Sequence, residues 1–446
     1  MAICASRARP PVSRSLMRRP GALRRISPMR VSAHLLRSSL LRSSWTVIDQ
    51  GVVSLGAFLL NIVLARHLPP AEYGAFALVL GTLMLVQLIN SSLIFYPMSI
   101  RSTVLAEDER QKLIGRSLVL LAGLCLPLML LVGTGLVLMG RADLLVPLLL
   151  YFFVAQVQET LRRGLFAEFR HRDALIGDLI GCLGQVALVL LLLQHGPVDL
   201  AEVFYALALA SSVALAVNYW QVRADFRDLR RLRATMADFW SLGRWSLANN
   251  LTGASRIQLF LWGLAALFGA AATASFQAAH NVINLANPIL LGLCNVIPQT
   301  AARKFQDGYG TAWLAARPYA LAGALPILLC YGVLLVAPEL VLHLLYGAGS
   351  AYAGLVLPIR ILAAGALLGY SADMVCSYMH GVDAARLALL INGLGTFAAL
   401  SLFLPLATHF GVAGACGAVL ASSFVRLIAS QWILSRMIAD GRQPVV

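Results

Sequence analysis

The sequence predicts an all-α polytopic membrane protein, with twelve transmembrane helices in two six-helix lobes around a central cavity. Of the 446 residues, 59% are hydrophobic and only 12% are charged, and the mean hydropathy is +0.78. Soluble domains contain about 45–50% apolar and about 25% charged residues, so a water-soluble protein is excluded. The apolar runs are long and continuous, for example residues 118–132, whereas the strands of a membrane barrel read as alternating segments of about ten residues.

Twelve segments contain about 20 mostly apolar residues each, which is the length that an α-helix needs to cross a bilayer. Proline, glycine and charged residues separate these segments, for example at Pro69-Pro70 and at Gly196-Pro197. The expected spans are 45–67, 75–99, 114–139, 144–165, 173–195, 199–220, 245–268, 274–300, 314–337, 355–379, 384–406 and 410–437.

The basic residues of the loops predict the orientation, because short loops rich in Lys and Arg stay in the cytoplasm. On one side every loop carries such residues, and the longest of them, 221–244, contains six Arg. On the opposite side Arg66 and Arg141 stand out, and several loops contain no Lys or Arg. This alternation supports twelve crossings and places both termini in the cytoplasm.

The two halves of the chain match each other weakly at an offset of about 200 residues. Phe76 aligns with Phe276, the short outer loops coincide, and Pro97 falls one place from Pro298. Two sets of six spans in the same orientation imply two lobes related by an axis along the membrane normal, with a cavity between them. The expected parts are a tail at 1–44, an N-terminal lobe at 45–220, a linker at 221–244, a C-terminal lobe at 245–437 and a tail at 438–446.

The N-terminal tail and the linker are both basic. Ten Arg and no acidic residue precede Trp45, so we expect residues 1–44 to form a disordered cytoplasmic extension. Aromatic residues do not interleave with these Arg, so nucleic-acid binding is not expected. In the linker, Phe226, Leu229 and Leu232 could form an apolar stripe on a basic helix at the anionic inner leaflet. The alternative is a solvated loop.

Polar residues inside the spans are costly, so they usually face a cavity or another helix. The eighth span carries one continuous polar face, because its polar residues recur at steps of three and four, and Pro288 should bend the helix just beyond them. Weaker polar positions occur in three other spans. The candidate substrate-binding residues are Gln277, His280, Asn281, Asn284 and Asn287 in the eighth span, Asn249, Thr252 and Arg256 in the seventh, Gln87 and Asn90 in the second, and Asp49 in the first.

Arg256 is the most informative single residue. It lies about eleven residues into its span, or roughly 17 Å at 1.5 Å per residue, near the middle of a hydrocarbon core about 30 Å thick. Two interpretations stay open. Arg256 binds an anionic cargo in a hydrated cavity, or it forms a structural ion pair with a buried acid such as Asp49, Asp178 or Asp373.

Three stretches resemble polysaccharide-transporter flippases of the multidrug/oligosaccharidyl-lipid/polysaccharide exporter superfamily. The first is GVVSLGAFLLNIVLARHLPPAEYGAFALVLGTLMLVQLINSSLIFYPMSIRS, with its turn around Pro70 and Glu72-Tyr73-Gly74. The second is LFGAAATASFQAAHNVINLANPI, and the third is Tyr346-Gly347 in an outer loop. The resemblance covers about residues 45–437. A departure is Arg256, because the family frequently has an Asp early in the seventh span, so the chain is a divergent member.

The resemblance implies a function in surface polysaccharide biosynthesis. A member of this family would move a polyprenyl-diphosphate-linked oligosaccharide across the cell inner membrane by alternating access, as in the assembly of lipopolysaccharide O-antigen or exopolysaccharide. The chemistry agrees, because guanidinium binds phosphate oxygens and carboxamides suit sugar hydroxyls. The expected partners are the lipid-linked oligosaccharide and membrane lipid, with H⁺ or Na⁺ as an open choice of coupling ion. We expect a monomer without cofactor or metal.

Two alternatives remain. A multidrug/cation antiporter of the same superfamily would need carboxylates in its lobes, but the deepest charge in the sequence is positive. A membrane-embedded polysaccharide polymerase or ligase would use a sizeable outer loop with Arg, His or acids. The longest outer loop, 338–354, contains only Glu339 and His343 of these types. The sequence therefore favours a transporter over an enzyme.

Overall fold

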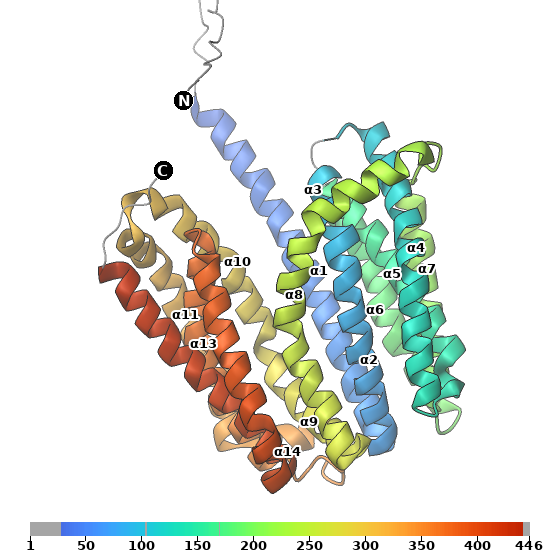
Figure 1. Cartoon of the computed structure of the whole chain (residues 1–446), viewed down its shortest axis with the longest axis vertical. Coiled ribbons are helices and arrows are strands. Elements are labelled where there is room, and N and C mark those ends of the chain that lie inside the picture. Colours follow the sequence, from blue (N-terminus) through green and yellow to red (C-terminus); the bar gives the residue numbers. More distant parts are fainter. Residues whose placement is uncertain (1–27, 103–104, 169, 440–446) are drawn as a thin grey trace, which may run out of the picture. The chain divides into compact units, whose positions relative to one another are not determined.

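The computed structural model describes residues 28–102, 105–168 and 170–439. Over these ranges the regular secondary structure is entirely helical (Figure 1). The chain divides into two units, residues 1–43 and residues 44–446. All contacts discussed below lie within the second unit.

The helices of the first half follow each other in short steps. Between α2 and α3 the chain forms one π-helical turn at Ser91–Phe95, so the two helices continue as one span. The helices are α1 (Pro28–His67), α2 (Pro70–Asn90), α3 (Tyr96–Ser102), α4 (Glu107–Leu138), α5 (Leu145–Ala167), α6 (His171–Gln194) and α7 (Leu200–Val222).

The second half repeats this pattern. A 3₁₀ turn at Asn284–Ala286 joins α9 to α10 in one span. The helices are α8 (Leu232–Phe268), α9 (Ala270–Ile283), α10 (Asn287–Lys304), α11 (Tyr309–Val336), α12 (Pro338–Tyr346), α13 (Val356–Gly381) and α14 (Ala385–Ala439).

Ten helical stretches in the described ranges are long and apolar enough to cross a membrane. One of these stretches, α14, consists of two helices that meet at Gly411, where φ is +59°. The apolar end of α8, Gln258–Phe268, is a further, shorter candidate. Dividing α14 and adding α8 gives the twelve crossings that the sequence predicts.

Two boundaries differ from the sequence-based expectation. α1 begins at Pro28, whereas the first span was expected to begin at 45. The stretch 28–44 contains four Leu and three Arg, which are good helix formers, and Pro28 suits a first helical position. The second difference is the linker, because α8 begins at Leu232 and most of 221–244 belongs to the helix of the seventh span.

Within residues 44–446 the helices form two groups. In the first, α5 packs on α4, α6 and α7; in the second, α13 packs on α10, α11 and α14. α2 contacts α8 and α9, so it joins elements from both halves of the chain (Figure 1). α2 begins at Pro70 and α9 begins at Ala270, which are 200 residues apart, the offset at which the two halves match.

A close backbone contact fixes the N-terminal ends of α2 and α9 against each other. A Cβ atom at position 74 would lie 1.8 Å from the carbonyl oxygen of Ala270, so only glycine fits at Gly74. This contact gives the glycine of the Glu72-Tyr73-Gly74 turn a physical role.

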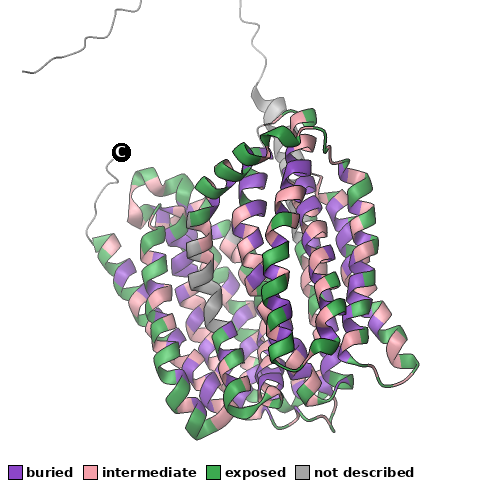
Figure 2. Ribbon diagram, turned by 45° about the vertical axis from the view of Figure 1, so that its right-hand side comes forward, coloured by how far each residue is buried: buried purple, intermediate pink, exposed green. Residues whose placement is uncertain are grey.

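Exposed residues lie along many of the helices (Figure 2), and a large number of them are apolar. Leu130, Leu131 and Phe397 are 73%, 66% and 73% exposed. In water such surfaces would be costly, but lipid tails are as apolar as leucine, so they are stable in a bilayer.

Candidate functional site

A cavity of about 720 Å³ lies among α1, α2, α8 and the α9–α10 span. Its volume falls within the usual range of ligand sites, roughly 300–1,000 Å³. Its polar lining residues are Gln50, Ser54 and Asn61 from α1, Gln258 from α8, and Gln277, His280, Asn281, Asn284 and Asn287 from the α9–α10 span.

The walls of this cavity differ in chemistry. α1 and the α9–α10 span supply polar side chains at helical spacing, so each presents one polar face. α2 supplies an apolar wall that includes Leu80, Met84 and Leu88. None of the described lining residues is Asp, Glu, Lys or Arg. The cavity therefore combines two carboxamide-rich walls with one apolar wall.

The bend in the α9–α10 span follows from its sequence. Pro288 has no N–H, so it cannot continue the α-helical hydrogen-bond ladder. The chain forms a 3₁₀ turn at Asn284–Ala286, in which the Asn287 N–H donates to the Asn284 carbonyl. This turn lets Asn284 and Asn287 both line the cavity.

A hydrogen-bonded network connects three helices beside the cavity. The Tyr73 hydroxyl donates to Asn61 Oδ1 at 3.2 Å and accepts from Asn281 Nδ2 at 2.8 Å. Gln277 Nε2 donates to Asn281 Oδ1 at 2.8 Å. Tyr73 is fully buried and Asn281 is only 5% exposed. Asn61 lies near the C-terminal end of α1, and Tyr73 and Gln277 lie toward the N-terminal ends of α2 and of the α9–α10 span, so the network joins the three helices there.

Two further tyrosines cover this network. The rings of Tyr73 and Tyr352 meet edge to face with centroids 6.1 Å apart, and Tyr346 lies 5.2 Å from Tyr352. The Tyr346 hydroxyl donates to the carbonyl of Ala278 at 2.9 Å. Burial raises the pKa of the Tyr352 hydroxyl to about 12. The segment containing Tyr346-Gly347 thus packs against the middle of α9.

Farther along the span, the carboxamides are available to a ligand. The side chains of Asn284 and Asn287 make no hydrogen bond to any residue that the structure describes. On the facing helix, Gln50 Nε2 donates to Ser54 Oγ at 3.3 Å, and both side chains keep unused polar atoms.

The structure brings together five of the predicted residues, those of the eighth span. Gln87 is not among the lining residues, and Asn90 is fully buried, where it donates to Gln156 Oε1 on α5 at 3.0 Å. The side chains of Asn249, Thr252 and Arg256 lie outside the described part of the chain, although their backbone belongs to α8.

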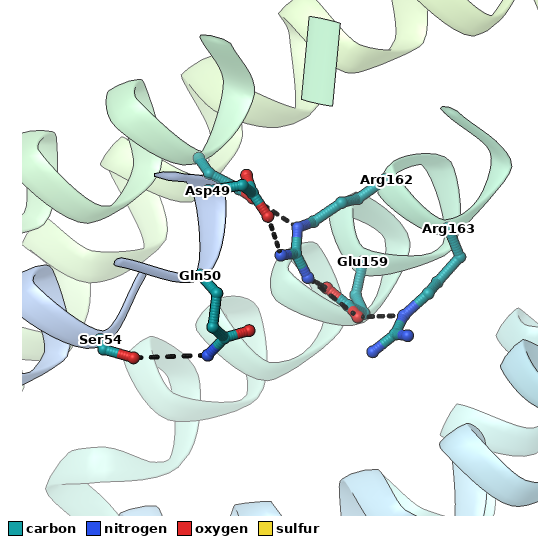
Figure 3. Close-up of polar contacts among 7 residues, drawn as sticks. Asp49, Gln50, Ser54, Glu159, Arg162 and Arg163 are labelled. Carbon is teal, nitrogen blue, oxygen red and sulfur yellow. Dashed lines mark hydrogen bonds and ion pairs between the residues drawn. The ribbon is translucent and has the colours of Figure 1, made fainter. Parts of the chain in front are cut away.

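Asp49 belongs to a buried ionic cluster and does not line the cavity (Figure 3). The Arg162 guanidinium binds Asp49 Oδ2 at 2.8 Å and Glu159 Oε2 at 3.1 Å, and its Nε binds Asp178 Oδ2. Arg163 Nε binds the other side of Glu159 at 2.6 Å. Figure 3 shows Asp49 turned toward Arg162 while its neighbour Gln50 points toward Ser54, so α1 serves the cluster on one face and the cavity on another.

A second ion pair, with a buried arginine and a half-buried acid, joins two of the C-terminal helices. Arg426 on α14 is 8% exposed and pairs with Asp373 on α13, and its Nε donates to Asn392 Oδ1 at 3.0 Å. All three acids named as partners for Arg256 therefore bind another arginine, Arg162 or Arg426.

Sequence reasoning missed several residues of the site. Gln50, Ser54 and Asn61 recur on one face of the first span, which was a usable signal. Tyr73 gave no such signal, because its only sequence signature was its place in the Glu72-Tyr73-Gly74 turn. Arg162 resembled one more basic residue of a cytoplasmic loop, although Glu159 three residues earlier allows a helical pair.

A family model described as "Polysaccharide biosynthesis protein" matches residues 40–300, more than half of the chain. The chain belongs to this polysaccharide biosynthesis family. Curated protein sequences gave no match to it.

Solved structures of similar fold include transporters and a flippase. An inward-facing multidrug resistance MATE family transporter of the MOP superfamily is 16% identical with a TM-score of 0.74, over 88% of this chain and 96% of that one. The inward closed lipid II flippase MurJ is 9% identical with a TM-score of 0.68, over 89% of this chain and 87% of that one. A MOP superfamily transporter from Pyrococcus furiosus Vc1, reported with a binding pocket of reverse polarity, is 16% identical with a TM-score of 0.60, over 90% of this chain and 95% of that one.

These comparisons confirm two predictions for this member of the polysaccharide biosynthesis family. The family resemblance holds, and the chain has the helical membrane fold of the MOP superfamily. The described part of the chain contains no group of three or more His, Cys, Asp or Glu that could hold a metal ion.

Proposed function

We propose that the protein translocates a polyprenyl-diphosphate-linked oligosaccharide from the inner to the outer leaflet of the cell inner membrane, by alternating access, for surface polysaccharide biosynthesis. The single observation that carries the proposal is the two-sided cavity, with carboxamides on α1 and the α9–α10 span and an apolar wall on α2. Sugar hydroxyls both donate and accept hydrogen bonds, as carboxamides do. An apolar wall suits a cargo that is attached to a lipid.

The cavity residues have different roles in this proposal. Asn284, Asn287 and Gln50 bind the glycan, while Asn281 and Gln277 hold the outer closure with Tyr73. His280 completes the polar wall, stacked on Phe276 with centroids 6.1 Å apart. The outer network must break to release the cargo outward.

Residues of the seventh span complete the proposed site. Arg256 is the proposed ligand of the diphosphate, with Asn249 and Thr252 beside it, because a guanidinium deep in a span needs an anionic partner. This assignment rests on the depth of Arg256 in the sequence. Asp49 and Asn90 are proposed to hold the helices together, given their partners Arg162 and Gln156.

The multidrug/cation antiporter is the weaker alternative. A cationic drug needs a carboxylate in its cavity, and none of the described lining residues is acidic. Three acids of the N-terminal half, Asp49, Glu159 and Asp178, surround Arg162 instead. The proposal also includes H⁺ or Na⁺ as the coupling ion, both termini in the cytoplasm and a monomeric state. It further includes a role in O-antigen or exopolysaccharide assembly.

Reconstitution into liposomes tests the proposal. A polyprenyl-diphosphate-linked oligosaccharide with a fluorescent sugar is placed in both leaflets, and an external glycosidase reports how much reaches the outside. The protein should raise the accessible fraction from about half to nearly all within the assay time, and protein-free liposomes should not. Transport of a cationic dye without transfer of the lipid-linked glycan would instead support the antiporter.

A further inference from the structure

The cavity lining has a charge pattern that bears on the nature of the sugars. Of the nine polar lining residues, seven carry carboxamides, one is Ser54 and one is His280. The described lining contains no Asp, Glu, Lys or Arg. Carboxamides have no net charge, so these walls can satisfy hydroxyl and acetamido groups but cannot neutralise a carboxylate.

A carboxylate in such a cavity would lose most of its water. Transfer of an ionised group to an apolar environment is far more costly than transfer of a hydrogen-bonded neutral group, unless an opposite charge meets it. Arg162 on α5, which pairs with Asp49 next to the lining residue Gln50, already binds three carboxylates. It therefore has no capacity for another, and in the proposed function the diphosphate occupies Arg256.

The shape of the lining fits a neutral pyranose. A pyranose has hydroxyl groups around its rim and apolar C–H groups on its faces. Asn284 and Asn287, with their unused side-chain donors and acceptors, can meet the rim, while Leu80 and Met84 on α2 can pack against a face. Both kinds of contact are available in this one cavity.

We infer that the cavity selects uncharged sugars, either neutral hexoses or N-acetylhexosamines, over acidic sugars such as hexuronic acids. The inference rests on the proposed function and specifies its substrate class. The subsite consists of Asn284, Asn287 and Gln50, opposite the apolar wall of α2.

The test compares two lipid-linked trisaccharides on the same polyprenyl diphosphate, one neutral and one with a single hexuronic acid in place of a hexose. In proteoliposomes the neutral compound should cross at least about tenfold faster, because a site built from neutral hydrogen-bonding groups discriminates strongly against a group that it cannot pair. Asn284→Lys adds a cation to the wall and should reduce or reverse this ratio. Asn284→Gln keeps a carboxamide and should preserve it.

The outcomes separate this inference from the proposed function. Equal rates for the two compounds, or a ratio that Asn284→Lys does not change, would overturn the selectivity while lipid-linked transport still stands. If neither compound crosses in liposomes with correctly inserted wild-type protein, the proposed function fails, and the inference fails with it.

Discussion

The hydroxyl of Tyr73 on α2 accepts a 2.8 Å hydrogen bond from the side-chain amide of Asn281 on α9. The two residues lie 208 positions apart, and each is buried. The same hydroxyl donates to Asn61 on α1. One phenol oxygen therefore joins three helices, two from the first half of the chain and one from the second, at the end of the cavity that the sequence predicts to face outward.

Tyr73→Phe should favour opening at this outer end. The change keeps the ring and removes two hydrogen bonds, worth roughly 1–3 kcal/mol together. Cysteine accessibility at the outer ends of α2 and α9, or distances between spin labels there, should report a larger open population. Tyr352→Phe is the matched control, because the buried Tyr352 hydroxyl has no hydrogen-bond partner among the described residues. An identical response of the two variants would remove Tyr73 from the closure.

Arg162→Ala should destabilise the N-terminal half severely. It leaves Asp49, Glu159 and Asp178 without their shared cation, and breaking a buried ion pair costs about 3–5 kcal/mol. Thermal unfolding in detergent and the amount of protein in the membrane measure the effect.

The control for Arg162 is its neighbour. The Arg163 side chain is 41% exposed and binds only Glu159, so Arg163→Ala should cost less than about 1 kcal/mol. Removing charge on both sides, with Arg162→Gln and Asp178→Asn together, should restore part of the stability lost in Arg162→Ala. Unchanged stability of Arg162→Ala would contradict a structural role for the cluster.

Gly395→Ala should destabilise the C-terminal helices. A Cβ at this position would lie 2.4 Å from Cγ of Arg426, so the Arg426–Asp373 pair must move. Overpacking of this kind costs typically 1–3 kcal/mol. Gly393→Ala lies on the same helix with open space around it, and it should be neutral or slightly stabilising. The melting temperature of Gly395→Ala should therefore lie below that of Gly393→Ala. Equal melting temperatures would argue against a tight contact between position 395 and Arg426.

Arg256→Ala should abolish transfer of a lipid-linked glycan while the protein still reaches the membrane. Arg256→Lys should recover only part of the activity, because an ammonium lacks the planar fork that binds two phosphate oxygens. If Arg256 instead forms a structural ion pair, Arg256→Ala leaves the partner acid unpaired, and the protein should be lost from the membrane. Membrane levels measured beside transport distinguish the two, and normal transport by Arg256→Ala rejects the diphosphate role.

The sequence predicted the number and position of the spans well because each signal was local. A run of about 20 apolar residues between breakers requires no knowledge of its neighbours. The polar face from Gln277 to Asn287 was equally local, since helical spacing alone places those side chains together.

Contacts between distant helices could not be predicted in this way. The partners Tyr73 and Asn281, or Arg162 and Asp49, depend on how helices pack, and a single sequence does not encode that directly. The start of the first helix could not be predicted either, because the apolar run begins near Trp45 whereas α1 begins at Pro28.

The measurement that tests the account most directly is transport by a variant with both Asn284→Leu and Asn287→Leu. These side chains line the cavity without hydrogen-bond partners in the described structure, so their loss should remove sugar contacts and leave the fold intact. Transfer of a neutral polyprenyl-diphosphate-linked oligosaccharide should fall at least about tenfold at equal membrane levels, the effect of losing roughly 1.4 kcal/mol of binding. Ser275→Ala on α9, whose exposed hydroxyl binds only the carbonyl of Ala271, should transport normally. Wild-type transfer by the double variant would contradict the cavity as the route of the cargo.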